Sequence, residues 1–545
     1  MVSNYGPKDR WLLFIAALLV LPPFVLPLYN PDLFWHLSCA RWILEHAAFP
    51  REDFLSFTKS GHPWADFEWL SQLVFYGAHR AGGLGALWAL KNLLLGLSLF
   101  LTVKTLDLHG IRGPLKAAAI AAWGAVNMAH ADIRPDLISK AIFSGLFYFL
   151  ERERLGRGRF PGGWFGLPAV FALWANFHAA YPMGLALLFF YALGDVAEGR
   201  RKAALGRAGL TALCALATAA NPYGLGAHEV LRRHWAEREL VARFIQEWGP
   251  TTFTKAGHIP FWPMLAVVLA LLACGGAPTG AALGVLYFGY SAVQHTRLGS
   301  YFTVLAVPVA AAQAVRLCSP EKARLAFLGV VLLLGVYYPW ALGRLSLGKI
   351  FDGVFVPMGA AEFMDRERET VSRLRVYNSW EWGGYLGWRL SPWHKVFGDG
   401  RYIFHQQLPE VQESVSSPEN GRRFLERYDL GAAVVRNIGS AVRTVKGYPD
   451  GSEKVFWRPW YLSYFPKEKW ALAYWDRQAL FFVRRDRVPA GWLSAREYRY
   501  VRPGDDAAFE EALRLKEIPL DAVDRERARH DRDLQDYAWM DSRLK

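Results

Sequence analysis

Long apolar runs are the feature that most constrains the fold of this chain. Of its 545 residues, 52% are hydrophobic, and they are gathered in runs rather than spread evenly, which is typical of helices that lie in lipid. About eleven runs are long enough, or nearly so, to cross a hydrocarbon core of about 30 Å. They lie near residues 11–29, 84–103, 115–129, 137–150, 164–175, 180–197, 204–220, 260–274, 280–293, 300–317 and 325–343. The sequence therefore predicts a mainly α fold, a polytopic transmembrane helix bundle of about eleven spans.

The basic residues explain the formal net charge of +14 without a nucleic-acid partner. With Lys8 and Arg10 at a cytoplasmic N terminus, nearly every alternate loop carries several lysines or arginines, which is the positive-inside pattern; "GGAPTG" at 275–280 lacks them. These loops contain Lys104–Lys116, Arg152–Arg159, Arg200–Arg207 and Arg316–Arg324. An odd number of crossings then leaves everything after about residue 345 outside. We expect a multi-pass protein of the bacterial inner membrane, with a periplasmic C-terminal domain and no nucleic-acid partner.

Two domains follow from this change of character along the chain. Residues 1–345 form the predicted transmembrane domain, whose first outer loop, 30–83, holds two amphipathic stretches suited to a membrane surface. Residues 346–545 are rich in charge and read as a soluble extracytoplasmic α/β domain. There we predict a helix at 358–370, strands near 374–378, 394–398 and 432–436, and a closing hairpin around Asp476.

The unusual polar residues gather in the opposite, outer loops. The first loop contains "NPDLFWHL" and "FPREDFLSFTKSGHPWADFEWLSQ", and later outer loops contain "HADIRPD", "WANFHAAYP", "QEWGP" and "QHTRLGSYF". Ionisable groups between helices that otherwise face lipid are costly and commonly line a substrate cavity. The pattern therefore predicts a functional site at the outer face.

A resemblance appears in residues 32–70, "DLFWHLSCARWILEHAAFPREDFLSFTKSGHPWADFEWL". This segment resembles the first outer loop of the GT-C superfamily of membrane glycosyltransferases, of the bacterial type that uses polyprenyl-phosphate sugars and is similar to mannosyltransferases and oligosaccharyltransferases. Weaker similarity extends through "NSWEWGGYLGWRL" and "VFGDGR". The resemblance implies a sugar on a polyprenyl phosphate or pyrophosphate as donor, with the first acidic residue of the loop, here Asp32, as catalytic base. It leaves open whether the acceptor is a lipid, a glycan or a protein.

The residue types fit this chemistry, because transfer needs a base for the acceptor proton and cations for the departing phosphate. Asp32 supplies the base, and His36, one helical turn later, is a catalytic candidate that orients it. A divalent cation, magnesium or manganese, held by Asp32, Asp66 or Glu68 with His178 is a further expectation. The candidates for substrate binding are Trp64, Arg134, Lys140, Asn176, His178, His295 and Arg297.

Each candidate also has a structural interpretation that the sequence leaves open. Asp32, Asp66 and Glu68 stand where helices are predicted to begin, so they suit helix capping as well. Arg134 suits a local ion pair with Asp136, and Lys140 suits snorkelling to the interface. The remaining alternatives concern other residues: a turn or cap for Asp53, backbone hydrogen bonds for Asn176 and His178, headgroup contacts for His295 and Arg297, and a turn for "FGDGR".

The function predicted from these observations is transfer of a sugar from a lipid-linked donor to an envelope acceptor at the outer face of the inner membrane. The alternative is a polytopic membrane protein without catalysis, a transporter or an assembly factor for envelope polysaccharide. A transporter favours internal repeats and broken helices at mid-membrane, neither of which the sequence shows clearly.

Overall fold

The computed structural model describes residues 7–158, 160–342 and 348–541 of the chain, and these form two compact units. The first, called the helical unit, contains the residues up to Asn30, Ile43–Phe49 and Ala65–Asp352. The second, called the mixed unit, contains Pro31–Trp42, Pro50–Trp64 and the residues from Gly353 onward. The predicted domain boundary after residue 345 lies within 343–347, outside the described residues. Two pieces of the first outer loop thus belong with the C-terminal part of the chain.

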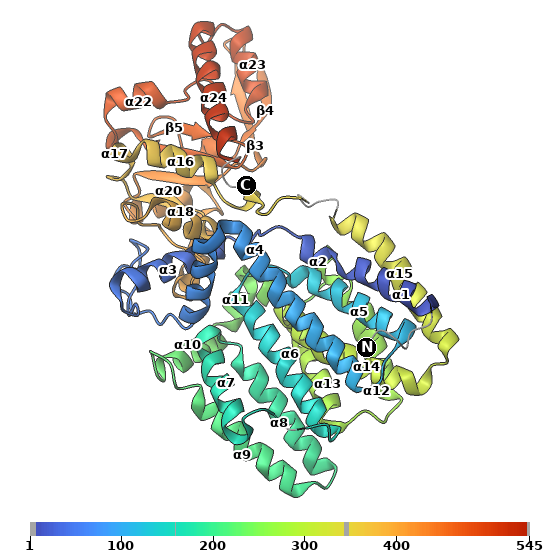
Figure 1. Ribbon diagram of the computed structural model, residues 1–545. Coiled ribbons are helices and arrows are strands. Elements are labelled where there is room, and N and C mark those ends of the chain that lie inside the picture. The colour runs from blue at the N-terminus through green and yellow to red at the C-terminus, as the bar shows by residue number, and fades with distance from the viewer. Residues whose placement is uncertain (1–6, 159, 343–347, 542–545) are drawn as a thin grey trace. The chain divides into compact units, whose positions relative to one another are not determined.

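Every predicted apolar run coincides with helical structure in the helical unit (Figure 1). The proline pair Pro22 and Pro23 separates the first run into two helices, as expected of residues that fix φ and lack an amide donor. The helices are α1 (Pro7–Val20), α2 (Pro22–Val25), α4 (Trp69–Leu108), α5 (Gly113–Asn127), α6 (Pro135–Arg154), α7 (Gly163–Phe177), α8 (Tyr181–Ala197), α9 (Arg201–Ala217), α12 (Phe261–Ala273), α13 (Thr279–Gln294), α14 (Gly299–Leu317) and α15 (Pro320–Leu342).

Length and composition single out four helical segments that can cross a membrane within the described residues. They are Trp69–Leu108, Ala256–Ala273, Thr296–Leu317 and Pro320–Leu342, and two shorter apolar segments are Trp11–Val25 and Tyr181–Ala197. The helical prediction for the runs is confirmed, whereas the number of spans and the orientation of the termini stay predictions.

Helix α4 joins two pieces that the sequence separates. Gly82 and Gly83 have non-helical backbone angles, with φ +60° at Gly83, a conformation that costs glycine little. The break divides the amphipathic stretch that begins at Trp69 from the apolar run that ends near residue 103. The predicted distinction between a surface helix and a span is therefore visible as a kink.

Helix α14 lies at the centre of the helical unit. Of its most apolar window, 78% is buried, and it packs against α5, α12 and α13. Helix α5 also contacts α1 and α15, α4 packs along α6, and α8 lies between α9 and α13. Shorter helices occupy the loops: η1 (Met128–His130), α10 (Gly226–Ala236), α11 (Arg238–Phe244), η2 (Gln246–Trp248), η3 (Ala256–His258) and η4 (Thr296–Leu298).

The mixed unit is built on a four-stranded sheet with strand order β1-β2-β6-β5. Strand β1 (Val376–Asn378) is parallel to β2 (Ala432–Arg436), and the other pairs, with β5 (Trp470–Trp475) and β6 (Ala479–Arg484), are antiparallel. The predicted closing hairpin is confirmed: Asp476 accepts hydrogen bonds from the backbone amides of Gln478 and Ala479 in the turn. A separate hairpin pairs β3 (Ala441–Gly447) with β4 (Glu453–Pro459).

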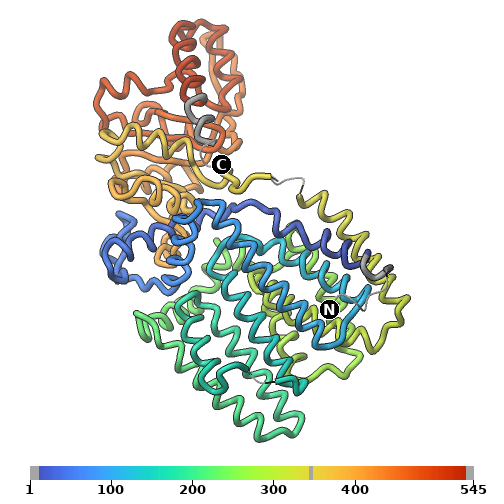
Figure 2. Tube along the Cα trace, viewed as in Figure 1, coloured from blue at the N-terminus to red at the C-terminus, as the bar shows by residue number. Residues whose placement is uncertain are grey.

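Helices surround these strands, and the predicted α/β character of the C-terminal part is confirmed. Figure 2 follows this part of the chain in orange and red. The helices are α3 (Asp32–His46), which begins in the first outer loop, η5 (Gly353–Phe355), α16 (Met358–Arg366), α17 (Arg368–Val371), η6 (Trp380–Trp382), α18 (Gly383–Leu390), η7 (Tyr402–Gln407), α19 (Leu408–Ser414), α20 (Pro418–Arg427), α21 (Tyr461–Tyr464), η8 (Arg485–Arg487), α22 (Ala490–Arg496), α23 (Asp506–Arg514) and α24 (Leu520–Asp541).

One predicted strand, near 394–398, is wrong. Only Val396 forms a bridge, and its partner is Ser56 of the first outer loop. The Val396 amide donates to the Leu55 carbonyl at 3.1 Å, and the Phe57 amide donates to the Val396 carbonyl at 3.0 Å. The segment is too short for a strand because its partner is a loop that pairs with it over a few residues.

Candidate functional site

The predicted site residues fall into two groups, one in each unit. Asp32, His36 and Trp64 belong to the mixed unit. The other group belongs to the helical unit and lies at the connections between helices or within the first turns of α6: Asp66, Glu68, Arg134, Lys140, Asn176, His178, His295 and Arg297. Each group is described by itself below.

Asp136 is the centre of the polar cluster in the helical unit. It lies in the first turn of α6, where the helix dipole favours a carboxylate. Lys140, one turn later, places Nζ 3.2 Å from its Oδ2, and the Tyr301 hydroxyl donates to its Oδ1 at 2.7 Å. Lys140 also donates to the His130 carbonyl at 3.1 Å. Lys140 is 4% exposed, so it is a buried ion-pair partner and the snorkelling alternative is wrong.

His178 extends this cluster toward the start of α4. Its Nδ1 lies 4.0 Å from Asp136 Oδ1 and 3.0 Å from Ser139 Oγ, while its Nε2 lies 3.5 Å from Glu68 Oε1. The residue stands in the connection between α7 and α8, and burial lowers its pKa to about 4. A neutral imidazole can donate from one nitrogen and accept at the other. It therefore links Glu68 to the first turn of α6.

Two arginines share one carboxylate in the same part of the unit. Arg134 forms an ion pair with Glu247, and Arg297 Nη1 lies 3.7 Å from the other oxygen of Glu247. The Arg297 guanidinium also lies 4.6 Å above the ring of Trp248. Burial alone would raise the pKa of Glu247, but the two arginines hold it below its ordinary value. Two positive charges against one negative charge leave a local net charge of +1.

The remaining candidates of this unit make structural hydrogen bonds. Asn176 accepts from Trp69 Nε1 at 2.8 Å and donates to the carbonyls of Ala172 and Ala220. His295 Nδ1 lies 2.7 Å from the Trp248 carbonyl oxygen. These contacts agree with the backbone role considered for Asn176 and place His295 beside the segment that carries Glu247.

The residues proposed for a divalent cation do not assemble a donor set. Asp66 Oδ1 accepts from Gln72 Nε2 at 2.6 Å, and Glu68 stands at the N-cap of α4 without a capping hydrogen bond from its side chain, facing His178. Across the described residues, no group of three or more histidine, cysteine, aspartate or glutamate side chains could hold a metal ion. Magnesium and manganese need several oxygen ligands, and the divalent cation expected at these residues stays a prediction.

In the mixed unit, Asp32 is the first residue of α3, and glycines allow backbone to approach it. A Cβ added at Gly400 would overlap the Asp32 carboxylate and lie 3.3 Å from Trp35 Nε1. A Cβ at Gly384 would lie 3.1 Å from the Pro31 carbonyl oxygen and 3.2 Å from the Trp35 amide. The "VFGDGR" and "WEWGGYL" segments, which resemble the GT-C pattern only weakly, thus pack around the start of α3.

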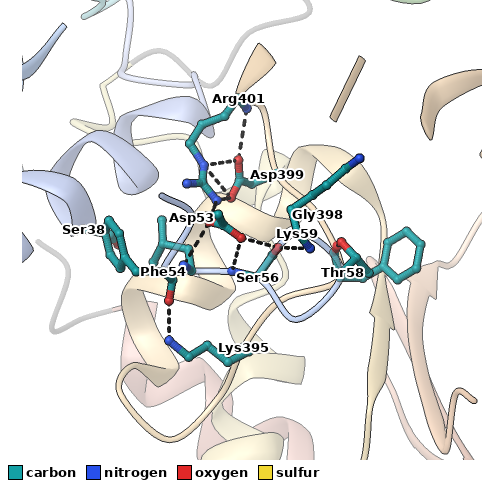
Figure 3. A network of polar contacts seen from close by, with 12 residues as sticks. Ser38, Asp53, Phe54, Ser56, Thr58, Lys59, Lys395, Gly398, Asp399 and Arg401 are labelled. Atoms are coloured by element: carbon teal, nitrogen blue, oxygen red, sulfur yellow. Dashed lines mark hydrogen bonds and ion pairs between the residues drawn. The ribbon is translucent and has the colours of Figure 1, made fainter. Parts of the chain in front are cut away.

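A buried ion network fixes the first of these segments (Figure 3). Arg401 donates from Nη2 to Asp53 Oδ1 at 2.6 Å and to Asp399 Oδ2 at 2.8 Å, and from Nε to Asp399 Oδ1 at 2.8 Å. All three side chains are at most 1% exposed. Asp53 also accepts from the amides of Leu55 and Ser56, at 3.1 Å each. The predicted turn role of Asp53 is therefore confirmed, and it also has a partner 348 residues away.

Further contacts in Figure 3 join the same two segments. The Thr58 hydroxyl donates to the Phe397 carbonyl at 2.5 Å, and Lys395 donates to the Phe54 carbonyl. Trp64 is 4% exposed, and its ring lies 4.7 Å beneath the Arg401 guanidinium. This places Trp64 in the core, where it shields the network.

His36 is also buried, at 3% exposed, with its ring 3.6 Å from that of Trp35. It lies one turn after Asp32 on α3. Its role in orienting Asp32 stays a prediction.

Sequence reasoning missed several members of these clusters. Tyr301 lies inside an apolar run and Glu247 in a short loop, and neither has a motif of its own. The spacing of Asp136 and Lys140 could have indicated their ion pair, since residues four apart lie on one face of a helix. Arg401 was interpreted only as part of a turn, because nothing local indicates its partner Asp53.

Comparison with known proteins gives a limited result. No protein-family model matches the chain, and no curated protein sequence matches it. A solved structure, ArnT from Cupriavidus metallidurans in the apo state, is similar with a TM-score of 0.48 and 14% identity, covering 88% of this chain and 98% of that one. ArnT from the same organism bound to undecaprenyl phosphate has a TM-score of 0.46 and 13% identity, with coverages of 87% and 98%. Because both TM-scores are below 0.5, the functional inference rests on the residues of this chain.

Proposed function

We propose that this chain is an integral membrane glycosyltransferase of the GT-C type that uses a polyprenyl-phosphate or pyrophosphate sugar as donor. The acceptor hydroxyl attacks the anomeric carbon, and its proton passes to the Asp32 carboxylate. The bond between the anomeric carbon and the phosphate oxygen breaks, and the lipid phosphate leaves with the bonding electron pair. No external oxidant, reductant or metal is needed for this balance.

The single observation that carries the proposal is the pair of arginines around Glu247. Arg134 and Arg297 are fixed by one shared carboxylate and keep a net charge of +1 in a partly buried setting. Fixed guanidinium groups are well suited to phosphate oxygens because their donors match the geometry of an oxyanion. They would stabilise the negative charge that develops on the departing phosphate.

The Asp136 cluster supports the same proposal. Lys140 is held between Asp136 and the His130 carbonyl, so its ammonium group has a fixed position at the start of α6. Charged groups buried between helices of a membrane protein are expensive, and where they occur they commonly mark a substrate path. An amphiphilic donor whose tail lies in lipid and whose phosphate reaches such groups fits this arrangement.

Asp32 is proposed as the base on grounds of position in the chain and local packing. Asp32 is the first acidic residue of the first outer loop and the first residue of α3. The glycine at position 400 leaves its carboxylate room beside backbone rather than beside a bulky side chain.

The test uses the full-length protein purified in detergent and a donor with a radiolabelled sugar. Transfer and release of polyprenyl phosphate are measured for the parent, Asp32→Asn and Arg297→Gln. Loss of a general base costs about 10² to 10⁴ in kcat, and loss of one fixed charge on the leaving group costs about 10². Arg232→Gln is the matched control, because Arg232 is 71% exposed and pairs with Glu229, which belongs to none of the clusters described above.

Equal turnover of Asp32→Asn and the parent would remove Asp32 as the base. Donor that binds to the parent without any release of lipid phosphate would favour the alternative of a transporter or assembly factor. Glycan analysis of cells with and without the protein then identifies the acceptor class.

A further inference from the structure

A second cationic site lies in the mixed unit, away from the residues considered so far. Arg502, between α22 and α23, is 5% exposed. Its Nε and Nη2 atoms are buried and have no hydrogen-bond partner among the described residues. These two atoms form the edge of a guanidinium that binds an oxyanion with two parallel hydrogen bonds. Arg502 thus has two neighbouring N–H groups that can donate to one oxyanion.

The carboxylates that act electrostatically on Arg502 are bonded to other arginines. Asp505 accepts from Arg458 Nε at 2.9 Å and from Arg458 Nη2 at 2.5 Å. Glu497 accepts from Arg485 Nη1 at 3.1 Å and forms a second hydrogen bond with the same guanidinium. Both carboxylates therefore accept hydrogen bonds from a different arginine. The positive charge of Arg502 is not balanced by either of them.

Lys467 adds a further positive charge to this place. Burial, together with the nearby charges of Arg502 and Arg458, lowers the pKa of Lys467 to about 8. Arg458, Lys467 and Arg502 carry three positive charges, and the nearby Asp505 and Glu468 carry two negative charges, which leaves +1. Backbone contacts hold the segment, since the Tyr461 hydroxyl donates to the Pro503 carbonyl at 2.7 Å.

Such an arrangement is costly without an occupant. A buried charge that lacks a partner has lost its hydration without compensation, and each buried donor without a hydrogen bond adds to that cost. An oxyanion would satisfy the two open donors and offset the excess charge. Water would satisfy the donors but leave the charge.

We propose that Arg502, with Lys467 and Arg458 beside it, forms an anion-binding site of the mixed unit that takes a phosphate or carboxylate group. The shared chemistry is a planar or tetrahedral oxyanion with two oxygens presented to the Arg502 edge. A uronic acid of an envelope glycan and a phosphate ester are the two sources of that group. This site is separate from the proposed transfer chemistry, and its binding is measurable whether or not transfer occurs.

The experiment measures binding of inorganic phosphate and of glucuronate to the full-length protein in detergent by calorimetry, with sodium chloride at equal ionic strength as the reference. The variants are Arg502→Gln and Lys467→Gln. Lys469→Gln is the matched control, because Lys469 is 66% exposed and pairs with Glu426 at 3.8 Å. We expect the dissociation constant to rise about tenfold or more in Arg502→Gln and several-fold in Lys467→Gln, with no change in the control.

The two probes separate the two sources, since a preference for phosphate assigns a phosphate ester and a preference for glucuronate assigns an acidic sugar. Binding of neither probe to the parent overturns the proposal. Equal affinity of Lys467→Gln and the parent also overturns it, and this variant decides the matter if Arg502→Gln does not fold.

Discussion

Removing Arg401 tests whether the buried network holds the first outer loop in the mixed unit. In Arg401→Met, Asp53 and Asp399 keep their positions but lose their common partner. The charge of the three side chains changes from −1 to −2, without solvent to compensate, because all three are at most 1% exposed. Three side-chain hydrogen bonds of 2.6–2.8 Å are lost together.

The magnitude follows from this burial. Breaking a buried ion pair by removing one partner costs about 3–5 kcal/mol. The same change at Arg423, whose side chain is 69% exposed and pairs with Glu419, costs about 0–1 kcal/mol. Arg401→Lys should fall between these limits, because it keeps the charge but cannot bond both carboxylates in a fork.

The assay is guanidinium unfolding of the full-length protein in detergent, followed by tryptophan fluorescence. Trp64, which lies 4.7 Å from the Arg401 guanidinium, is one of the 23 tryptophans that contribute to this signal. With an m-value of about 4 kcal/mol/M, the expected loss lowers the midpoint of the mixed unit by about 1 M. A shift in Arg401→Met no larger than that in Arg423→Met would refute the reasoning, since burial would then add nothing to the pair.

Three further predictions concern the Arg401 network, the backbone beside Asp32 and the arginine pair around Glu247. Burial would raise the pKa of Asp53, but Arg401 holds that pKa below its ordinary value. The stabilisation by the ionised carboxylate is therefore present above about pH 4 and is lost as the pH falls through the folded pKa. The free energy of unfolding of Asp53→Asn between pH 6 and pH 3 should depend less on pH than that of the parent. Gly400→Ala should lower kcat about tenfold with the donor KM unchanged, because its Cβ displaces the proposed base, whereas Gly439→Ala, with nothing within 4 Å, should leave kinetics unaltered. Glu247→Gln should lower the donor KM and also kcat, since the arginines gain net charge but lose their fixed geometry; a raised KM with unchanged kcat would contradict that role.

Much of the helical unit could be predicted because its signal is local. An apolar run long enough for a span becomes a helix whatever its partners are, and Gly82 and Gly83 mark the end of the amphipathic part of α4 through their own backbone freedom. The hairpin around Asp476 was visible for the same reason, because the turn is closed by its own side chain.

The site could be predicted only in part, because side-chain pairing across the chain leaves no periodic pattern. Arg134 was weighed against its neighbour Asp136, but its partner is Glu247, 113 residues away. Lys91, inside an apolar run, bonds the Leu26 carbonyl at 2.6 Å and the Pro23 carbonyl at 3.3 Å. A single sequence shows that such a charge is expensive, but it does not show which group compensates it.

Two pieces of the first outer loop, 31–42 and 50–64, belong to the mixed unit together with the C-terminal part. The chain passes between the units after residues 30, 42, 49, 64 and 352. The pieces 31–42 and 50–64 find their partners at Gly400, Val396 and Arg401. A chain that ended at Asp352 would keep every apolar helix but leave Asp53 buried without its cation or exposed with its turn undone. The C-terminal part is therefore a structural requirement for the segment that carries Asp32, because its residues Gly400, Val396 and Arg401 make these contacts.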